Sequence, residues 1–416
     1  MFSEDQEELV AMGIFNIILT MNKVTKLFIA TSCCLIILHA TAQDYTADNR
    51  LYKTIDWNAF LEKLEKNADL IFFDIRTPGE RSDTSKYSAN NQGRIKGAIQ
   101  TDYFDFNKYY PEYLKHKDDT IYLYCSHSMR SRRLAKRLAD SSFSKVVNVN
   151  GGMSYLNLYG EKRYPLRKKY YETSNRYGLV SPLDLKRILK DKSVQIIDIR
   201  SDSVYNGTSK SEADNAVGTI EGVVHLPKAQ LLKDASIVLD AQKKILLVDN
   251  WCDESPDVAK KLIALGYGHV SVLLFGLSDL IDRIPSSKRS FLKTRYPIIL
   301  PEELLSLRKK NEVTLVDIRT ITEYTNTDTL AWKNVGRLKD AIHIPPGAFT
   351  KAKFDSLKEK PIVIYDIMAH DELYEAALKL KAYGLENFSL MAGGIYFVHW
   401  KIANEHMENL RWLVDK

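Results

Sequence analysis

The tripeptide Asp-Ile-Arg occurs three times in this chain of 416 residues, each time at the end of an apolar run. The runs are LIFFDIR, VQIIDIR and VTLVDIR, and a helical pattern precedes each of them. Apolar runs of this kind, bounded by polar residues, are typical of buried strands. Their recurrence indicates that the chain consists of copies of one structural unit. The three tripeptides are Asp74–Arg76, Asp198–Arg200 and Asp317–Arg319.

Further landmarks follow each tripeptide in the same order. A glycine-led stretch (GRIKGAIQ, GTIEGVVH, GRLKDAIH) comes first, then a strand that runs into a helix, then an apolar strand that ends in glycine. Strands separated by helices predict a parallel β-sheet flanked by helices on both faces. We therefore expect an α/β protein of three tandem domains, at residues 45–165, 172–288 and 292–416. Two basic, aromatic segments, Glu161–Gly178 and Arg283–Pro297, are interpreted as solvated, partly packed linkers.

Residues 1–42 are interpreted as an N-terminal extension plus a signal peptide. From Met21 the chain reads MNKVTKLFIATSCCLIILHATAQ, which has a basic start, an apolar run and a small-x-small cleavage site that ends at Ala42. Met21 is the expected start, and residues 1–20 do not fit this scheme. The expected location is exported, in the periplasm or outside the cytoplasm. The alternative is an uncleaved membrane anchor, although the apolar run is shorter than the ~20 residues that a span needs.

The composition narrows the class of protein further. Hydrophobic residues make up 45% of the chain and charged residues 27%, as in soluble globular proteins. The formal charge of +6 is spread along the chain without a dense basic arm, so no nucleic-acid partner is expected. After cleavage at Ala42 only Cys125 and Cys252 remain, which is too few for a disulfide framework.

The landmarks together resemble the rhodanese-like (thiosulfate sulfurtransferase) domain family. The likeness rests on the strand ending in Asp-x-Arg, the Gly-x-Ile-x-Gly-Ala stretch, the strand–cysteine–loop–helix segment and the closing Gly-Gly, and it covers nearly the whole mature chain. The family's common loop is Cys-Arg-Ser-Gly-Asn-Arg-Ser. Here the loop is CSHSMRS, which keeps Cys125, Arg130 and Ser131 but departs at Ser126 and Ser128. These departures bear on substrate preference more than on the domain assignment.

A cysteine at this point is suited to sulfur chemistry. The carboxyl end of a parallel strand is where such sheets bind ligands, and the following helix directs its positive end there. We expect the loop amides to surround the sulfur and favour the thiolate, which is the nucleophile that takes up a sulfane sulfur as an anionic persulfide. Arg130 and Arg132 would attract an anionic donor, and His127 would orient it. The predicted site is Cys125 as the catalytic residue, with a substrate-binding set of Ser126, His127, Ser128, Met129, Arg130, Ser131 and Arg132.

The other two copies lack the cysteine. Alignment of the strands puts Asp249 and Asp366 in its place, and the third loop is expected to be one residue longer. A carboxylate cannot carry a sulfane sulfur, so both copies are predicted to be inert in sulfur transfer. Cys252 could be a second nucleophile, a resolving thiol or a packed residue, and we favour the packed residue. The acidic residues near both loops, and His370, are interpreted as helix-dipole partners, so no metal and no cofactor is expected.

The predicted function is exported transfer of a sulfane sulfur from thiosulfate or a similar small anionic donor. The acceptor is a thiol, cyanide or a partner protein. One alternative is a non-enzymatic rhodanese-like scaffold or redox sensor. A weaker alternative is a cysteine-based phosphatase, because related phosphatases place the arginine one residue further from the cysteine than Arg130 lies from Cys125.

Overall fold

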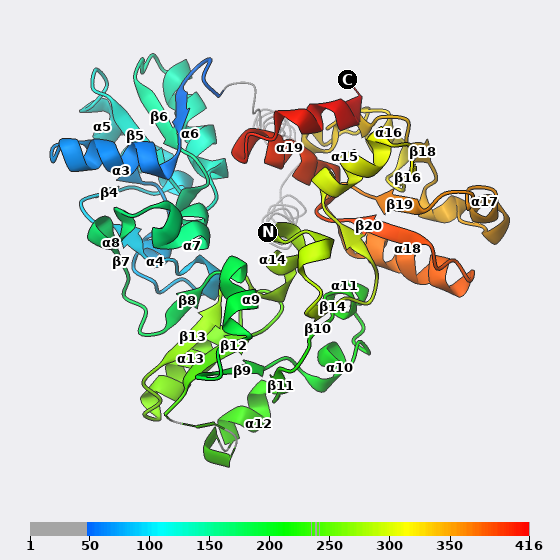
Figure 1. The fold of residues 1–416 in the computed structure, drawn as a ribbon. Coiled ribbons are helices and arrows are strands. Elements are labelled where there is room, and N and C mark those ends of the chain that lie inside the picture. Colours follow the sequence, from blue (N-terminus) through cyan, green and yellow to red (C-terminus); the bar gives the residue numbers. More distant parts are fainter. Residues whose placement is uncertain (1–47, 234, 238, 241, 416) are drawn as a thin grey trace, which may run out of the picture.

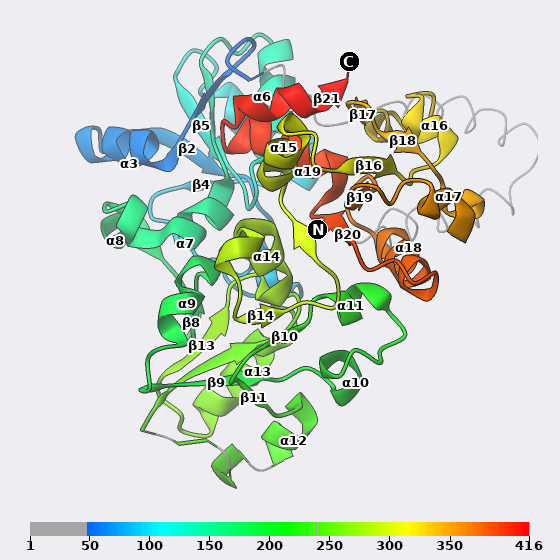
Figure 2. The same ribbon diagram turned by 45° about the vertical axis from the view of Figure 1, so that its right-hand side comes forward.

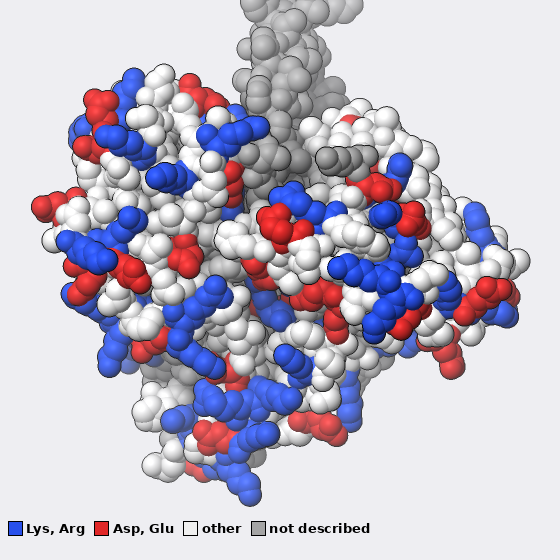
Figure 3. Space-filling view, turned by 45° about the horizontal axis from the view of Figure 1, so that its top comes forward, with Lys and Arg blue, Asp and Glu red and all other residues white. Residues whose placement is uncertain are grey.

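The computed structural model describes residues 48–415 except 234, 238 and 241. The predicted signal peptide and the extension before it lie outside these residues. Figures 1 and 2 show three domains, coloured blue to cyan, green, and yellow to red, arranged around a common centre. None of the described helices is long and apolar enough to cross a membrane. On the face drawn in Figure 3, basic and acidic side chains are interspersed.

Each domain contains a parallel sheet, as predicted, and each sheet has five strands in the same spatial order. In the first domain this order is β1-β6-β5-β2-β4. The other two are β8-β13-β12-β9-β11 and β15-β20-β19-β16-β18. The strands are β1 (Lys53–Ile55), β2 (Ile71–Asp74), β4 (Ile99–Gln100), β5 (Ile121–Tyr124), β6 (Val146–Val149), β8 (Gly178–Val180), β9 (Val194–Asp198), β11 (Val224–His225), β12 (Lys244–Val248), β13 (Val270–Leu273), β15 (Ile298–Ile299), β16 (Thr314–Asp317), β18 (Ile342–His343), β19 (Ile362–Tyr365) and β20 (Phe388–Met391).

Helices cover both faces of the first sheet. Successive strand side chains point to opposite faces, so Phe72 packs in one core cluster and Phe73 in the other. Helices α3 (Trp57–Lys66) and α7 (Gly152–Arg163) supply the first cluster, and α5 (Phe106–Leu114) and α6 (Met129–Asp140) supply the second. Helix α3 is capped by Asp56, whose side chain accepts a hydrogen bond from the N–H of Ala59.

The Asp-Ile-Arg landmark is a buried ion pair that joins two of the repeated segments. In the first domain Arg76 and Asp74 are both 0% exposed, with a closest N–O distance of 2.7 Å. Arg76 also donates to the carbonyl oxygen of Gly93, the first residue of the glycine-led stretch, at 2.8 Å. The same bond recurs from Arg200 to Gly218 and from Arg319 to Gly336. Because the ion pair recurs in all three domains, including those without the cysteine, its role is structural.

The predicted linkers contribute strands to the domains before them. Strand β7 (Tyr171–Glu172) lies beyond the predicted end of the first domain, yet it pairs antiparallel with β3 (Arg94–Ile95). Strand β14 (Leu292–Lys293) falls in the range predicted for the third domain, but it pairs with β10 (Thr219–Ile220) of the second. The third domain has the same ladder between β17 (Arg337–Leu338) and β21 (Val414–Asp415). Strand pairs that join such distant segments leave no local signal in the sequence.

The three domains meet near the loop that follows β5. Asn404, the last residue of α19 (Gly394–Asn404) in the third domain, accepts a hydrogen bond from Arg132 at 2.7 Å. Its carbonyl oxygen accepts another from Asn150, at 2.8 Å. In the same region Arg283 of the second domain forms an ion pair with Glu405 of the third. The third domain therefore packs against the first helix turn and the closing loop of the domain with the cysteine, and the second domain packs against the third.

Candidate functional site

Cys125 is the first residue after β5 and lies at the carboxyl end of a central strand. The closing Gly-Gly of the repeat packs against this loop. The backbone N–H of Met153, the next residue, donates to the Cys125 carbonyl oxygen at 2.9 Å. A Cβ added at Gly152 would lie 2.3 Å from that oxygen, and the glycine has φ +57°, so only glycine fits there. The equivalent bonds reach the carbonyl oxygens of Asp249 and Asp366. This backbone equivalence agrees with the predicted alignment of the three positions.

The sulfur of Cys125 is enclosed. The residue is 1% exposed, and the hydroxyl of Ser131 lies 3.6 Å from Sγ. The sequence predicted that loop amides would surround the sulfur, but Sγ accepts no hydrogen bond from them. Within the described part of the chain, the backbone N–H groups of residues 126–131 have no hydrogen-bond acceptor. The loop instead turns through Ser128, whose φ of 70° is left-handed, and enters α6 with these N–H groups unpaired.

Arg130 is held by a carboxylate of its own domain. Its guanidinium donates to both oxygens of Glu80, at 2.8 and 2.6 Å, and to the hydroxyl of Ser126 at 2.8 Å. Both charged residues are buried, at 5% and 3% exposure. Burial works to raise the pKa of Glu80, but the bonds from Arg130 outweigh it and hold that pKa below its usual value. The predicted role of Arg130 in attracting a donor stays a prediction, and Glu80 is the partner with which a donor would compete.

Of the remaining predicted residues, Arg132 and His127 contact other domains, and the rest lie in the loop and the first turn of α6. Arg132 is 1% exposed and turns toward Asp48, Asn150 and Asn404, so the structure places its guanidinium in the contact between domains. His127 packs against Phe275 of the second domain, with 5.6 Å between ring centroids, and burial lowers the pKa of its imidazole well below the usual value. Ser126, Ser128, Met129 and Ser131 stay in the loop and the first turn of α6.

In the second domain a carboxylate occupies the corresponding loop. Asp249 accepts hydrogen bonds from the backbone N–H groups of Cys252, Glu254 and Ser255, at 2.7, 2.9 and 2.8 Å. Burial raises the pKa of Asp249 to about 6, although these three N–H groups favour the charged form. The loop amides of this copy therefore bind an anion that belongs to the chain.

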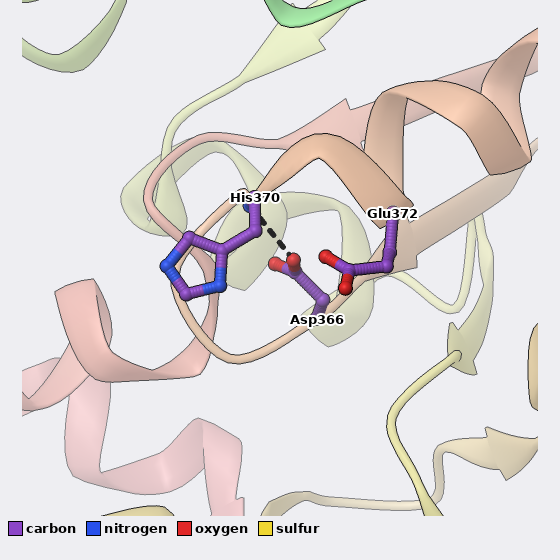
Figure 4. A group of neighbouring side chains, drawn as sticks. All are labelled: Asp366, His370 and Glu372. Carbon is purple, nitrogen blue, oxygen red and sulfur yellow. Dashed lines mark hydrogen bonds between the residues drawn. The ribbon is translucent and has the colours of Figure 1, made fainter. Parts of the chain in front are cut away.

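The third domain repeats this arrangement. Asp366 accepts from the N–H groups of Ala369 and His370, at 2.5 and 2.8 Å, and burial raises its pKa to about 6. Figure 4 shows the bond from His370 and the carboxylate of Glu372 beside it. One ligand-type atom from each of Asp366, His370 and Glu372 lies within 4.8 Å of the others. This group at the helix end therefore also has the composition of a cation site. The hydrogen bond that closes the helix after this loop is donated by the N–H of Leu385. Counted from Asp366, this N–H lies one residue further along the chain than its counterparts do in the other two copies, which confirms the longer loop.

Cys252 is not the counterpart of Cys125 but of Ser128. It lies three residues after Asp249 and has the same left-handed backbone, with φ 58°. The residue is 1% exposed within the apolar core of the second domain, and burial raises the pKa of its thiol far above the usual value. Both described cysteines are free thiols. This placement supports the interpretation of Cys252 as a packed residue.

Sequence reasoning missed several polar partners of the loop, among them Asn404 and Asn148. Asn404 is distant in sequence and gave no signal. Asn148 in β6 is 0% exposed and accepts a hydrogen bond from Ser131 at 2.6 Å. A signal for Asn148 was present in the sequence, because the closing strand reads VVNV in the first copy and VSVL and FSLM in the others. A buried polar side chain in an otherwise apolar strand needs partners, and these partners lie in the loop.

These features define a class: a tandem α/β protein in which a single domain presents a thiol at its strand-end loop. The model of the Rhodanese-like domain matches residues 56–157, 181–282 and 300–400. The chain therefore belongs to the rhodanese-like family, as three consecutive domains.

Comparison with solved structures gives matches of low overall similarity. EanB in a complex with ergothioneine is 15% identical, with 85% of this chain and 98% of that chain covered and a TM-score of 0.26. A thiosulfate sulfurtransferase from Pseudomonas aeruginosa is 14% identical, with coverage of 85% and 66% and a TM-score of 0.22. No curated protein matches the sequence. The family assignment therefore rests on the domain model and not on these structures.

Proposed function

We propose that this protein is an exported sulfurtransferase that carries a sulfane sulfur on Cys125. The Cys125 thiolate attacks the outer sulfur of thiosulfate or a similar donor. The donor's S–S bond breaks, sulfite or its equivalent leaves with the electron pair, and a persulfide forms on Sγ. A thiophilic acceptor, such as a thiol, cyanide or a partner protein, then attacks the outer sulfur and regenerates the thiolate.

The observation that supports this proposal is a difference of one atom between the three loops. The carboxylate oxygens of Asp249 and Asp366 are two bonds from Cβ and reach the loop N–H groups. The Sγ of Cys125 is one bond from Cβ and does not reach them. A persulfide adds a second sulfur, so its terminal anionic atom is also two bonds from Cβ. The unpaired N–H groups of residues 126–131 are thus suited to hold the terminal sulfur of a Cys125 persulfide.

The same argument predicts that the second and third domains are inert. Their amides are already paired with a carboxylate of the chain, and neither Asp249 nor Asp366 offers a nucleophilic sulfur. Exported location is part of the proposal and is supported by the signal-like pattern of residues 21–42. A steady-state assay with thiosulfate and cyanide tests the activity. We expect turnover by the wild type and its loss in Cys125→Ser, and undiminished turnover in that variant would contradict the assignment.

A non-enzymatic scaffold or redox sensor is the alternative from another class. It predicts no turnover with any sulfane donor and an unchanged contact between domains in Cys125→Ser. The cysteine phosphatase remains the weaker alternative, and an aryl phosphate assay on the same preparations tests it. The loop spacing disfavours this activity, because Arg130 lies one residue nearer to Cys125 than the arginine of related phosphatases lies to its cysteine.

A further inference from the structure

Asn148 is a fully buried polar residue of β6, and its counterparts in the other two domains are apolar. Register defines these counterparts without ambiguity. Asn148 pairs with Leu123 of β5, two residues before Cys125. Val272 pairs with Leu247, two residues before Asp249, and Leu390 pairs with Ile364, two residues before Asp366. The strand position below the loop is therefore polar in the copy with the cysteine and apolar in the other two.

The carboxamide of Asn148 links the two serines of the Cys125 loop. Its Oδ1 accepts from the hydroxyl of Ser131 at 2.6 Å and from the hydroxyl of Ser128 at 3.1 Å. Its Nδ2 donates to the hydroxyl of Thr54 in β1 at 3.4 Å. Ser131 is also the residue whose hydroxyl lies next to Cys125 Sγ. A continuous polar chain thus runs from the edge strand to the sulfur.

The partners of Asn148 change together with it. Ser128, at the left-handed turn of the loop, corresponds to Cys252 and Ala369, which have the same backbone conformation. Thr54 pairs with Asn148 across the sheet, whereas Leu179 and Ile298 pair with the apolar counterparts. The counterparts in the second domain and those in the third each belong to an apolar core cluster; they are Cys252, Leu179 and Val272, and Ala369, Ile298 and Leu390. Within one chain, the polar set accompanies the thiol and the apolar set accompanies the carboxylate.

We propose that Asn148 is a positioning residue of the sulfur-transfer site, acting on Cys125 through Ser128 and Ser131. A left-handed conformation is uncommon for serine, and the bond from its hydroxyl to Asn148 offsets part of that cost. The bond to Ser131 fixes the start of α6 over the sulfur. In the other copies the carboxylate fixes the loop by binding the amides directly. Before sulfur is loaded, the first copy has no such anion, and Asn148 supplies the restraint from below.

The test is the alkylation of Cys125 by iodoacetamide, measured by peptide mass across a range of pH. Asn148→Leu introduces the side chain that the third domain carries at this position. We expect alkylation to slow about ten-fold, because loss of one buried acceptor frees two hydroxyls and the loop loses its alignment with the helix. The pH profile of the reaction should also move to higher pH. Asn215→Leu, which removes another buried asparagine in the second domain, should leave both quantities unchanged.

A serine double variant shows whether the effect passes through the hydroxyls. In the Ser128→Ala/Ser131→Ala background, Asn148→Leu should cause no further change, since nothing remains for Asn148 to hold. If Asn148→Leu does not fold, the serine variant alone decides, because it should slow alkylation by about the same factor. Alkylation at the wild-type rate in either variant would overturn the proposal.

The proposal rests on the proposed function only for its catalytic consequence, which is slower persulfide formation in Asn148→Leu. Alkylation needs no sulfur donor. A wild type that alkylates readily but gains no sulfur would therefore contradict the proposed function and leave the positioning role to be judged on the alkylation rates.

Discussion

The loop after β5 and the loop after β12 share a backbone and differ in what they hold. Both start at the carboxyl end of a central strand, turn through a left-handed residue and lead into a helix. In the second domain the amides of this turn bind the carboxylate of Asp249. In the first domain no described residue accepts a hydrogen bond from the corresponding amides. The loop there begins with the thiol of Cys125, whose side chain is one atom shorter than that of aspartate. The same framework thus forms a closed helix cap in the second domain, and in the first it leaves the amides without an acceptor among the described residues.

The fold keeps the same turn of backbone amides even in the domains where catalysis is not expected. Unpaired buried N–H groups are costly, so a copy that loses the cysteine needs another anion for its amides. Aspartate meets this need without a ligand, because its oxygens occupy the place proposed for the terminal persulfide sulfur. The carboxylates of the silent copies are then structural residues in their own right.

The largest expected effect comes from the glycine below the loop. Gly152→Ala should destabilise the first domain by more than ~4 kcal/mol, because the new Cβ would overlap the carbonyl group of Cys125. Gly276→Ala meets Asn250 in the same way and should cost a similar amount in the second domain. Urea denaturation gives the stability, and peptide mass after incubation with thiosulfate gives sulfur loading. Only the first variant should lose loading, and equal losses in both would remove the distinction between the loops.

A smaller loss is expected when the buried partner of Arg130 is removed. Glu80→Gln leaves a buried guanidinium without its charge partner and should cost ~3 kcal/mol. The matched variant in the third domain is Glu323→Gln, whose partner Lys333 is 26% exposed, and its cost should be ~1 kcal/mol. Thermal unfolding followed by circular dichroism measures both. Equal costs would mean that the two loops are supported alike.

The stability of the second domain should depend on pH through Asp249. Burial raises the pKa of Asp249 to about 6, so its ionisation in the folded state costs free energy that the unfolded chain does not spend. The free energy by which protonated Asp249 favours the folded state is fully present below about pH 4 and is lost as the pH rises through about 6. Wild type should therefore lose ~2 kcal/mol relative to Asp249→Asn between these limits. Unfolding of both proteins across this range measures the difference, and a constant difference would refute the assigned pKa.

Much of the fold and part of the site follow from the sequence. The strands that end in Asp-Ile-Arg, the position of Cys125 and its replacement by Asp249 and Asp366 are local patterns, and repetition makes them legible. The partners of the loop arginines are not local. Glu80 lies 50 residues before Arg130, and Asn404 lies 272 residues after Arg132. No periodicity encodes such contacts, because they depend on how the strands and domains assemble.

Persulfide formation on Cys125 is best tested by the mass of the Cys125 peptide after incubation with thiosulfate. Purified wild type, Cys125→Ser and Asp249→Cys should be measured together under non-reducing conditions. We expect a gain of one sulfur atom on the Cys125 peptide in wild type and in Asp249→Cys, and no gain in Cys125→Ser. A wild-type peptide of unchanged mass, or an equal gain on another residue in Cys125→Ser, would contradict this expectation.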